Sequence, residues 1–410
     1  MRPGRPLVIS DPMLLVRRDN DRLVMIREKK VVAAVPIREL SHVAVHGPVT
    51  FTGAALAGLL DEGIDVTLLS SGGKWRGLIS SAASKNVYLL LAQVDAWKRP
   101  ERRVAFARVL IAGKISGQRQ IVQRHAINRG SVRCEEAARR LLNLEGQCAA
   151  EEDVDSLRGV EGTASAAYFD VFEEMLSAGW RFPGRVRRPP TDPVNALLSF
   201  GYTLAVSEMA RALTLRGFDT RIGLVHGLRY GRESLALDLV EEFRAAMVDR
   251  FVLRSLNRGE FKVEDFETQD DGAVRLTQSA RRLFLERWED MLGEKAAALR
   301  NERPLTDEAV LLAGRIGKVE GGDGEGAEVD DGPIADDEEP EAPVTWRRRM
   351  ERQALRLWRF LMKGDPYVPL TATRKAAVVI GVAEGDGATA EVGGAGGGGK
   401  KRGGAGPKKG

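Results

Sequence analysis

The first 85 residues alternate short apolar runs with turn residues. The runs are three to five residues long and rich in β-branched side chains, a pattern typical of strands. They are Leu7–Ile9, Met13–Val16, Leu23–Ile26, Val31–Val35, Val43–Val45 and Val66–Leu69. One helix is predicted among them, from Thr52 to Glu62, with Thr52 as its N-cap and Gly63 at its end. Residues 1–85 are therefore expected to form a small β-rich domain.

From Asn86 onwards, apolar side chains recur every three or four residues, which predicts helices. The predicted helices are 87–97, 101–127, 132–144, 153–157, 194–215, 250–257, 279–292, 295–300 and 346–363. A short hairpin is predicted from the segments 261–266 and 272–276. The expected fold class is therefore α+β, with a larger, mainly α-helical domain over residues 86–316 that is completed by a C-terminal helix within 346–372.

Two segments have the composition of disordered chain. Residues 317–345 form an acidic linker of Gly, Asp, Glu and Pro, and residues 385–410 form a tail of Gly and Lys. Between Glu320 and Glu341 there are eleven acids and no Lys or Arg, so the rest of the chain carries 62 basic against 47 acidic residues. The formal charge is only +4 because it includes this acidic segment. The part of the chain that is expected to fold is distinctly basic, which favours a polyanion as partner.

The stretch from Val225 to Arg244 combines a lone histidine with a helix that carries acids. Its apolar residues Leu235, Leu239, Phe243 and Met247 recur every four positions and predict one buried stripe, with Ser234 as a plausible N-cap. Asp238 and Glu241 are three residues apart, so they lie one turn above each other on a neighbouring face. Two carboxylates so placed repel each other unless a cation lies between them, and His226 could supply a nitrogen ligand to that cation. The alternative is that these acids lie on a solvated helix face.

A further acid, Glu161, is surrounded by small residues, among them Gly159, Gly162 and Ala164. Small neighbours leave room for close approach of a helix or a phosphate, although Glu161 could equally be a first-turn acid near a helix N-terminus. Carboxylates with one imidazole suit Mn²⁺ or Mg²⁺ better than structural zinc. Such an ion on a phosphodiester supports phosphoryl transfer, with either water or a DNA 3′-hydroxyl as nucleophile.

Four motifs in this order resemble the CRISPR-associated adaptation endonuclease, the Cas1 family. They are Arg158-Gly159-Val160-Glu161-Gly162, the segment 188–200 with its Arg-Pro-Pro-Thr-Asp-Pro start, His226, and Gly231-Arg232-Glu233-Ser234-Leu235-Ala236-Leu237-Asp238-Leu239-Val240-Glu241-Glu242-Phe243-Arg244. The resemblance covers roughly residues 10–300, with a shorter echo near 350–370. Leu370 stands where that family more often has Phe.

The resemblance implies a β-sandwich-like N-terminal dimerisation domain and a helical catalytic domain. It implies Glu161, His226 and Glu241 as ligands of Mn²⁺ or Mg²⁺. Asp238 is then a neighbouring acid that either supports these ligands without touching the ion or is an alternative ligand. It further implies a DNA endonuclease and integrase that inserts short foreign DNA segments into a CRISPR repeat array. The implied partners are double-stranded DNA, a second copy of the chain as a homodimer, and a small CRISPR-associated protein that completes a heterohexamer.

Two other functions fit the same residues. One is a structure-specific DNA nuclease of repair with water as nucleophile, and the other is a DNA-binding scaffold without catalytic activity. Only two cysteines, Cys134 and Cys148, are present and no secretory signal precedes them, which indicates a reducing, cytoplasmic setting. No apolar run approaches the roughly 18 residues of a membrane span, so no membrane partner is expected.

Overall fold

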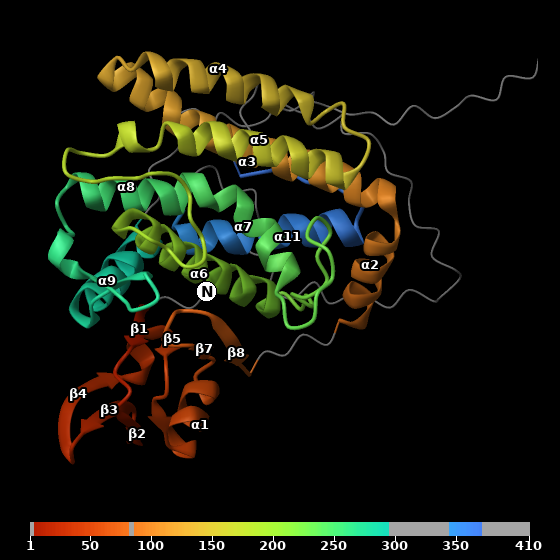
Figure 1. The fold of residues 1–410 in the computed structure, drawn as a ribbon. Coiled ribbons are helices and arrows are strands. Elements are labelled where there is room, and N and C mark those ends of the chain that lie inside the picture. The colour runs from red at the N-terminus through yellow and green to blue at the C-terminus, as the bar shows by residue number, and fades with distance from the viewer. Residues whose placement is uncertain (1–3, 82–85, 295–343, 371–410) are drawn as a thin grey trace, which may run out of the picture.

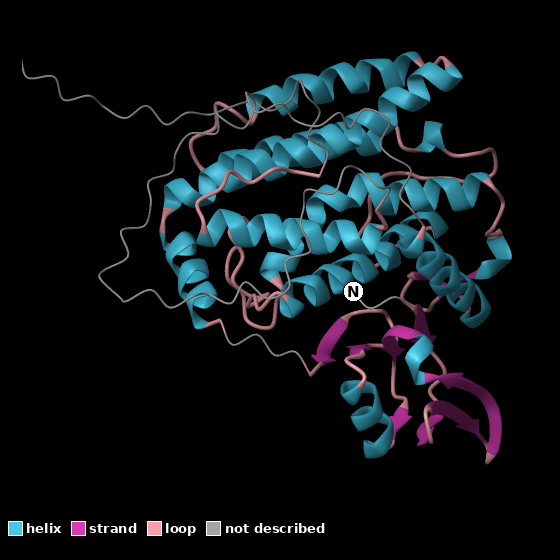
Figure 2. Cartoon of the chain, turned by 180° about the vertical axis from the view of Figure 1, so that it is seen from behind, coloured by secondary structure: helices cyan, strands magenta, loops and turns pink. Residues whose placement is uncertain are grey.

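The computed structural model describes residues 4–81, 86–294 and 344–370. It confirms the predicted α+β class, because the strands of the N-terminal region lie in one body and the helices that follow form another (Figure 1). The predicted helix 295–300, nearly all of the acidic linker 317–345 and the tail 385–410 lie outside the described residues. Seen from behind, the strands still form a separate body below the helices (Figure 2).

The N-terminal region contains two four-stranded sheets, with the strand orders β1-β5-β7-β8 and β4-β3-β2-β6. The strands are β1 (Arg5–Ile9), β2 (Leu15–Asp19), β3 (Arg22–Arg27), β4 (Lys30–Pro36), β5 (Leu40–His46), β6 (Thr50–Phe51), β7 (Asp65–Leu69) and β8 (Trp75–Ile79). Six of them coincide with the predicted apolar runs. The strands β6 and β8 were not predicted, because β6 has only two residues and β8 is interrupted by Arg76 and Gly77.

The two sheets share one hydrophobic core, to which β2 and β3 contribute Val16 and Leu23 and β5 contributes Val43. Helix α1 (Gly53–Asp61) covers this core, and its N-cap is Thr52, whose hydroxyl accepts a hydrogen bond from the Ala55 amide at 3.2 Å. The helix ends before Gly63, which has a positive φ of 67°. The expected β-sandwich-like domain with a single capped helix is confirmed within the described residues.

The second body is built around one long helix, α3. Its helices are α2 (Val87–Lys98), α3 (Pro100–Arg129), α4 (Val132–Gln147), α5 (Val154–Asp170), α6 (Pro193–Leu215), α7 (Ser234–Phe243), α8 (Arg250–Asn257), α9 (Gln278–Gly293) and α11 (Trp346–Met362). The predicted hairpin is present as β9 (Phe266–Thr268) and β10 (Val274–Leu276). Helix α3 packs against α4, α5 and α7. No described helix is long and apolar enough to cross a membrane.

Helix α5 corrects the prediction of a short helix over 153–157. Asp153 is the N-cap, since its carboxylate accepts from the Ser156 amide at 2.8 Å, and the helix continues to Asp170. The glycines at 159 and 162 are tolerated because Leu157, Val160 and Ala164 bury one face of the helix in the core. Glu161 therefore lies in the middle of a helix and not at its start.

Helix α7 continues through a π-helical turn, Arg244–Asp249, into α8. The predicted stripe is confirmed, because Leu235, Leu239, Phe243 and Met247 are all buried. The predicted N-cap is wrong: Glu233 precedes the helix, and the hydroxyl of Ser234 donates to the Gly227 carbonyl at 3.1 Å. π-turns recur at functional sites, and this one directly follows Glu241 and Glu242.

Helix α6 lies so close to the π-helical turn that Gly201 has no space for a side chain. A Cβ added there would lie 2.8 Å from Val248 Cγ1, whereas one added at Gly159 on α5 would meet nothing within 4 Å. We expect Gly201→Ala to lower the free energy of unfolding by roughly 1–3 kcal/mol through overpacking. Its control, Gly159→Ala, is expected to raise that free energy by up to about 1 kcal/mol. Urea unfolding checks both, and equal effects of the two substitutions would contradict this packing.

Candidate metal centre

Two of the predicted acids come together across helix α3. Glu161 on α5 and Glu241 on α7 reach the same side chain, Lys114, from different helices. They are 80 residues apart in sequence and meet because α5 and α7 both pack on α3. The spacing had suggested Asp238 as the partner of Glu241; the structure shows Glu161 and Glu241 on one shared cation, and Asp238 in contact with His226.

Lys114 is buried, with 5% of its side chain exposed, and its ammonium lies between the two carboxylates. It donates to Glu161 Oε1 and forms an ion pair with Glu241 Oε2 at 2.7 Å. Burial acts to lower the pKa of Lys114, but the negative charges of Glu241 and Glu161 outweigh it and raise the pKa above its ordinary value. The site thus contains a permanent positive charge.

A second cation, Arg244, reaches Glu241 from the π-helical turn. Its Nε lies 3.0 Å from Glu241 Oε2, and its guanidinium lies over the ring of Tyr202, 4.6 Å from the centroid. Burial acts to raise the pKa of Glu241, but Arg244, Lys114 and His226 outweigh burial and hold that pKa at about 2. Glu241 is therefore a carboxylate at any physiological pH.

Asp238 organises the loop that carries His226. Its Oδ2 accepts from the amides of Leu224 and Val225 at 2.6 and 3.0 Å. Its Oδ1 lies 2.7 Å from both the backbone N and the ring Nδ1 of His226. This fully buried carboxylate fixes the ring and leaves Nε2 as the nitrogen able to bind an ion, an arrangement common around metal-binding histidines.

The side chain of Glu242, next to Glu241 on α7, contacts helix α11 and the segment that follows it. It accepts from Gln353 Nε2 at 3.0 Å, from the hydroxyl of Tyr367 and from the amide of Leu370. Burial raises its pKa to about 7 despite these donors. Glu242 thus ties α7 to α11 and to the segment after it.

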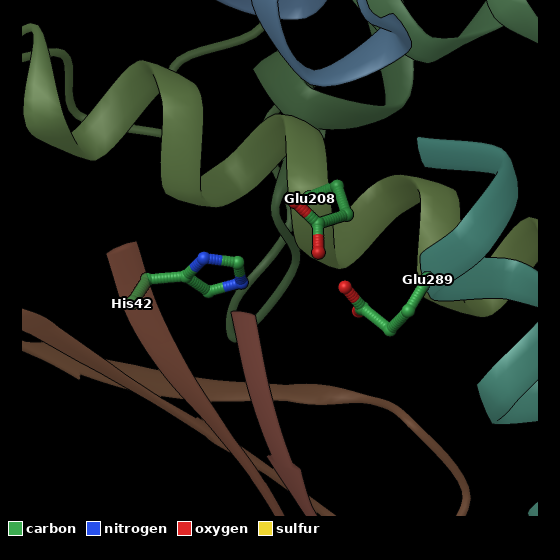
Figure 3. A group of neighbouring side chains, drawn as sticks. All are labelled: His42, Glu208 and Glu289. Carbon is green, nitrogen blue, oxygen red and sulfur yellow. The ribbon is translucent and has the colours of Figure 1, made fainter. Parts of the chain in front are cut away.

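A different group of side chains is packed tightly enough to bind an ion. Among the described residues, the ligand atoms of His42, Glu208 and Glu289 all lie within 4.8 Å of one another. His42 projects from β5 toward the two acids on α6 and α9 (Figure 3). Both carboxylates are already bridged by the buried guanidinium of Arg347, at 3.0 Å from Glu208 and 2.9 Å from Glu289. We therefore interpret this group as an ion-pair junction between the two bodies, just as Lys114 bridges Glu161 and Glu241 within the helical body.

The residues that the family resemblance implies, Glu161, Glu241 and His226, offer carboxylate oxygens and one imidazole nitrogen, the donor types suited to Mn²⁺ or Mg²⁺. Among the described residues, however, their ligand atoms do not all lie within 4.8 Å of one another. The two carboxylates come from separate helices and already share one cation. Cys134 and Cys148 are both buried on or next to α4 and are not in this group, so a thiolate zinc site is not indicated by the described residues.

Sequence reasoning missed both cations of the site. Lys114 is buried, as is Arg102 on the same helix. A signal was present, because Lys114 occupies the buried stripe of α3 with Leu110, Ile111 and Gln118 at spacings of three and four. A lysine at a core position requires a buried acid as its partner.

Solved structures share this fold. A casposase bound to integration product superposes with a TM-score of 0.68 at 18% identity, over 90% of this chain and 93% of that chain. A Cas1 protein from Thermotoga maritima gives a TM-score of 0.64 at 19% identity, over 87% and 97% of the two chains. The fold class is thus that of a β-domain joined to a helical domain, as in these proteins.

The family follows from sequence. The family model "CRISPR associated protein Cas1" matches residues 7–290. A CRISPR-associated endonuclease Cas1 of Rhodospirillum rubrum is 35% identical over 286 residues, which are 67% of this chain and 82% of that protein. One from Thermus thermophilus is 35% identical over 285 residues, 70% and 83% of the two chains. The chain belongs to the Cas1 family, which confirms the resemblance seen in the sequence.

The junction at Arg347 yields a test of stability. Removing its guanidinium leaves the largely buried Glu208 and Glu289 without the cation that bridges them, so we expect Arg347→Met to lower the free energy of unfolding by about 3–5 kcal/mol. Arg352→Met, on the same helix but half-buried, is the control and should change it by less than about 0.5 kcal/mol. Denaturant unfolding followed by circular dichroism checks both. A loss at Arg347 no larger than that at Arg352 would mean that the junction adds no stability.

Proposed function

We propose that this chain is a metal-dependent DNA endonuclease and integrase of CRISPR adaptation. It would join the 3′-hydroxyl of a short foreign duplex to the repeat array by phosphoryl transfer. The proposal rests on the meeting of Glu161 and Glu241 on one cation, with the His226 ring held by Asp238, which is on the same helix, α7, as Glu241. Relatives that are 35% identical are named CRISPR-associated endonucleases, in agreement with this chemistry.

Glu161, His226 and Glu241 would hold the ion, either Mn²⁺ or Mg²⁺. When bound, such an ion polarises a phosphoryl oxygen and offsets the charge that develops in transfer. The chain's own part is to orient the ligands. Asp238 holds the His226 ring, and Arg244 steadies Glu241 from the π-helical turn.

The partners are part of the proposal. The excess of basic residues outside the acidic segment supports double-stranded DNA as the substrate, both as the captured duplex and as the CRISPR repeat. One structural neighbour is part of a Cas6-RT-Cas1–Cas2 complex, at a TM-score of 0.66 and 23% identity. In line with it, we propose a homodimer formed through the N-terminal β-domain and a small CRISPR-associated partner that completes a heterohexamer.

Strand transfer tests the function directly. A labelled duplex with free 3′-hydroxyls is mixed with supercoiled DNA carrying the repeat, the protein and its small partner, in Mn²⁺, Mg²⁺ or chelator. We expect joined product that chelator abolishes and that Glu241→Ala or Glu161→Gln reduces by roughly a hundredfold or more. Asp155→Asn, an exposed acid on the same helix as Glu161, is the matched control and should leave joining unchanged.

Other outcomes identify the competing functions. Cleavage of branched DNA without joined product would indicate a repair nuclease. DNA binding that is unaffected by Glu241→Ala, with no joining or cleavage in either metal, would indicate a scaffold.

Asp238→Asn tests the positioning of His226. The amide retains the size of the carboxylate but presents an NH₂ group either to the loop amides or to the imidazole, so the ring loses its fixed orientation. We expect the affinity for Mn²⁺ to fall by about 10–100-fold, as for other partners of ligating histidines. Titration of free Mn²⁺ by electron paramagnetic resonance measures it. An unchanged affinity in a folded variant would show that Asp238 acts on the loop alone.

A further inference from the structure

Lys114 has a role that the proposed ligands do not explain. Its ammonium lies between the two carboxylates proposed to bind the metal ion, in contact with Glu161 and 2.7 Å from Glu241 Oε2. Among the described residues, its ion-pair partners are these two acids. The inference that follows rests on the proposed function, because it concerns the same site.

An ion and this ammonium compete for the same oxygen atoms. A divalent ion such as Mg²⁺ binds carboxylate oxygen at about 2.0–2.1 Å, directly along the lone pairs. Lys114 already contacts Glu161 Oε1 and Glu241 Oε2, and its side chain is only 5% exposed. Binding of the ion to these two oxygens therefore requires the ammonium to move away from at least one of them.

The charge balance points the same way. Two carboxylates, Glu161 and Glu241, face two cations, Lys114 and Arg244, and Asp238 beside His226 adds one more carboxylate. A divalent ion added to these five side chains would leave a surplus positive charge in a largely buried site, which is costly at low dielectric. Arg244 is held in place by the Tyr202 ring as well as by Glu241, whereas Lys114 is held by the two carboxylates.

We propose that the ammonium of Lys114 holds Glu161 and Glu241 together, and that it is displaced from at least one of these carboxylates when the ion binds. Lys114 is then a positioning residue, because it keeps the two carboxylates near each other before the ion binds. Because its ammonium competes with the ion, it also weakens the apparent affinity for the ion. Removing the ammonium should then destabilise the metal-free protein and strengthen metal binding.

The experiment is a Mn²⁺ titration of the full chain without DNA, with free Mn²⁺ measured by electron paramagnetic resonance, and thermal unfolding with and without Mn²⁺. For Lys114→Met and Lys114→Gln we expect an affinity at least about tenfold higher than in the original chain, because the competing charge is gone. Their melting temperature should be lower without metal and should rise more on adding Mn²⁺. Lys114→Arg, which keeps the charge, should bind Mn²⁺ no more tightly than the original chain.

Arg102→Met is the matched control, since Arg102 is also a buried cation on α3 with an acidic partner, Asp95, at 3.7 Å. It lies twelve residues before Lys114, about 18 Å along the helix, and should leave the Mn²⁺ affinity unchanged. If Lys114→Met does not fold, the ordering of Lys114→Gln, the original chain and Lys114→Arg carries the same test. An equal or lower affinity in the folded neutral variants would overturn the proposal.

Glu241→Ala separates this inference from the proposed function. If Glu241→Ala leaves Mn²⁺ binding intact, the metal centre itself is misplaced and the proposed function loses its site. If Glu241→Ala abolishes binding while the neutral Lys114 variants bind as the original chain does, the metal centre stands and only the role of Lys114 is refuted.

Discussion

The structure of the helical domain depends on two carboxylates that share one buried cation. Glu161 and Glu241 contact Lys114, so α5 and α7 are both tied to the middle of α3. A buried charge without a partner costs several kcal/mol, so the buried ammonium favours the packing that brings both acids to it. The same contact keeps the two carboxylates close together beside the hydrophobic core.

A second pair of acids shares a different buried cation. At the junction of the two bodies, Glu208 and Glu289 share the guanidinium of Arg347, which binds both acids through several N–H groups. A guanidinium in this geometry makes a rigid, fixed connection, whereas the ammonium of Lys114 is a compact point charge on a flexible stem. The Arg347 cluster is therefore suited to hold the two bodies together, and the Lys114 cluster is suited to exchange its cation for an ion.

Much of the fold could be predicted from the sequence, because its signals are local. The β-branched runs locate most strands, Thr52 and Gly63 delimit α1, and the stripe from Leu235 to Met247 identifies the buried face of α7. The site could be predicted only in part. The family resemblance implies Glu161, His226 and Glu241, but the meeting of Glu161 and Glu241 at Lys114 depends on packing between helices far apart in sequence. The π-helical turn that brings Arg244 to Glu241 has no local signature in the sequence either.

An anomalous difference map from crystals grown with Mn²⁺ would locate the ion. We expect a strong peak between Glu161, Glu241 and the Nε2 atom of His226, with the Lys114 ammonium moved off at least one carboxylate. A peak at His42, Glu208 and Glu289 instead, or no peak near Glu241 in a protein that joins DNA, would mean that the ion does not bind where we propose.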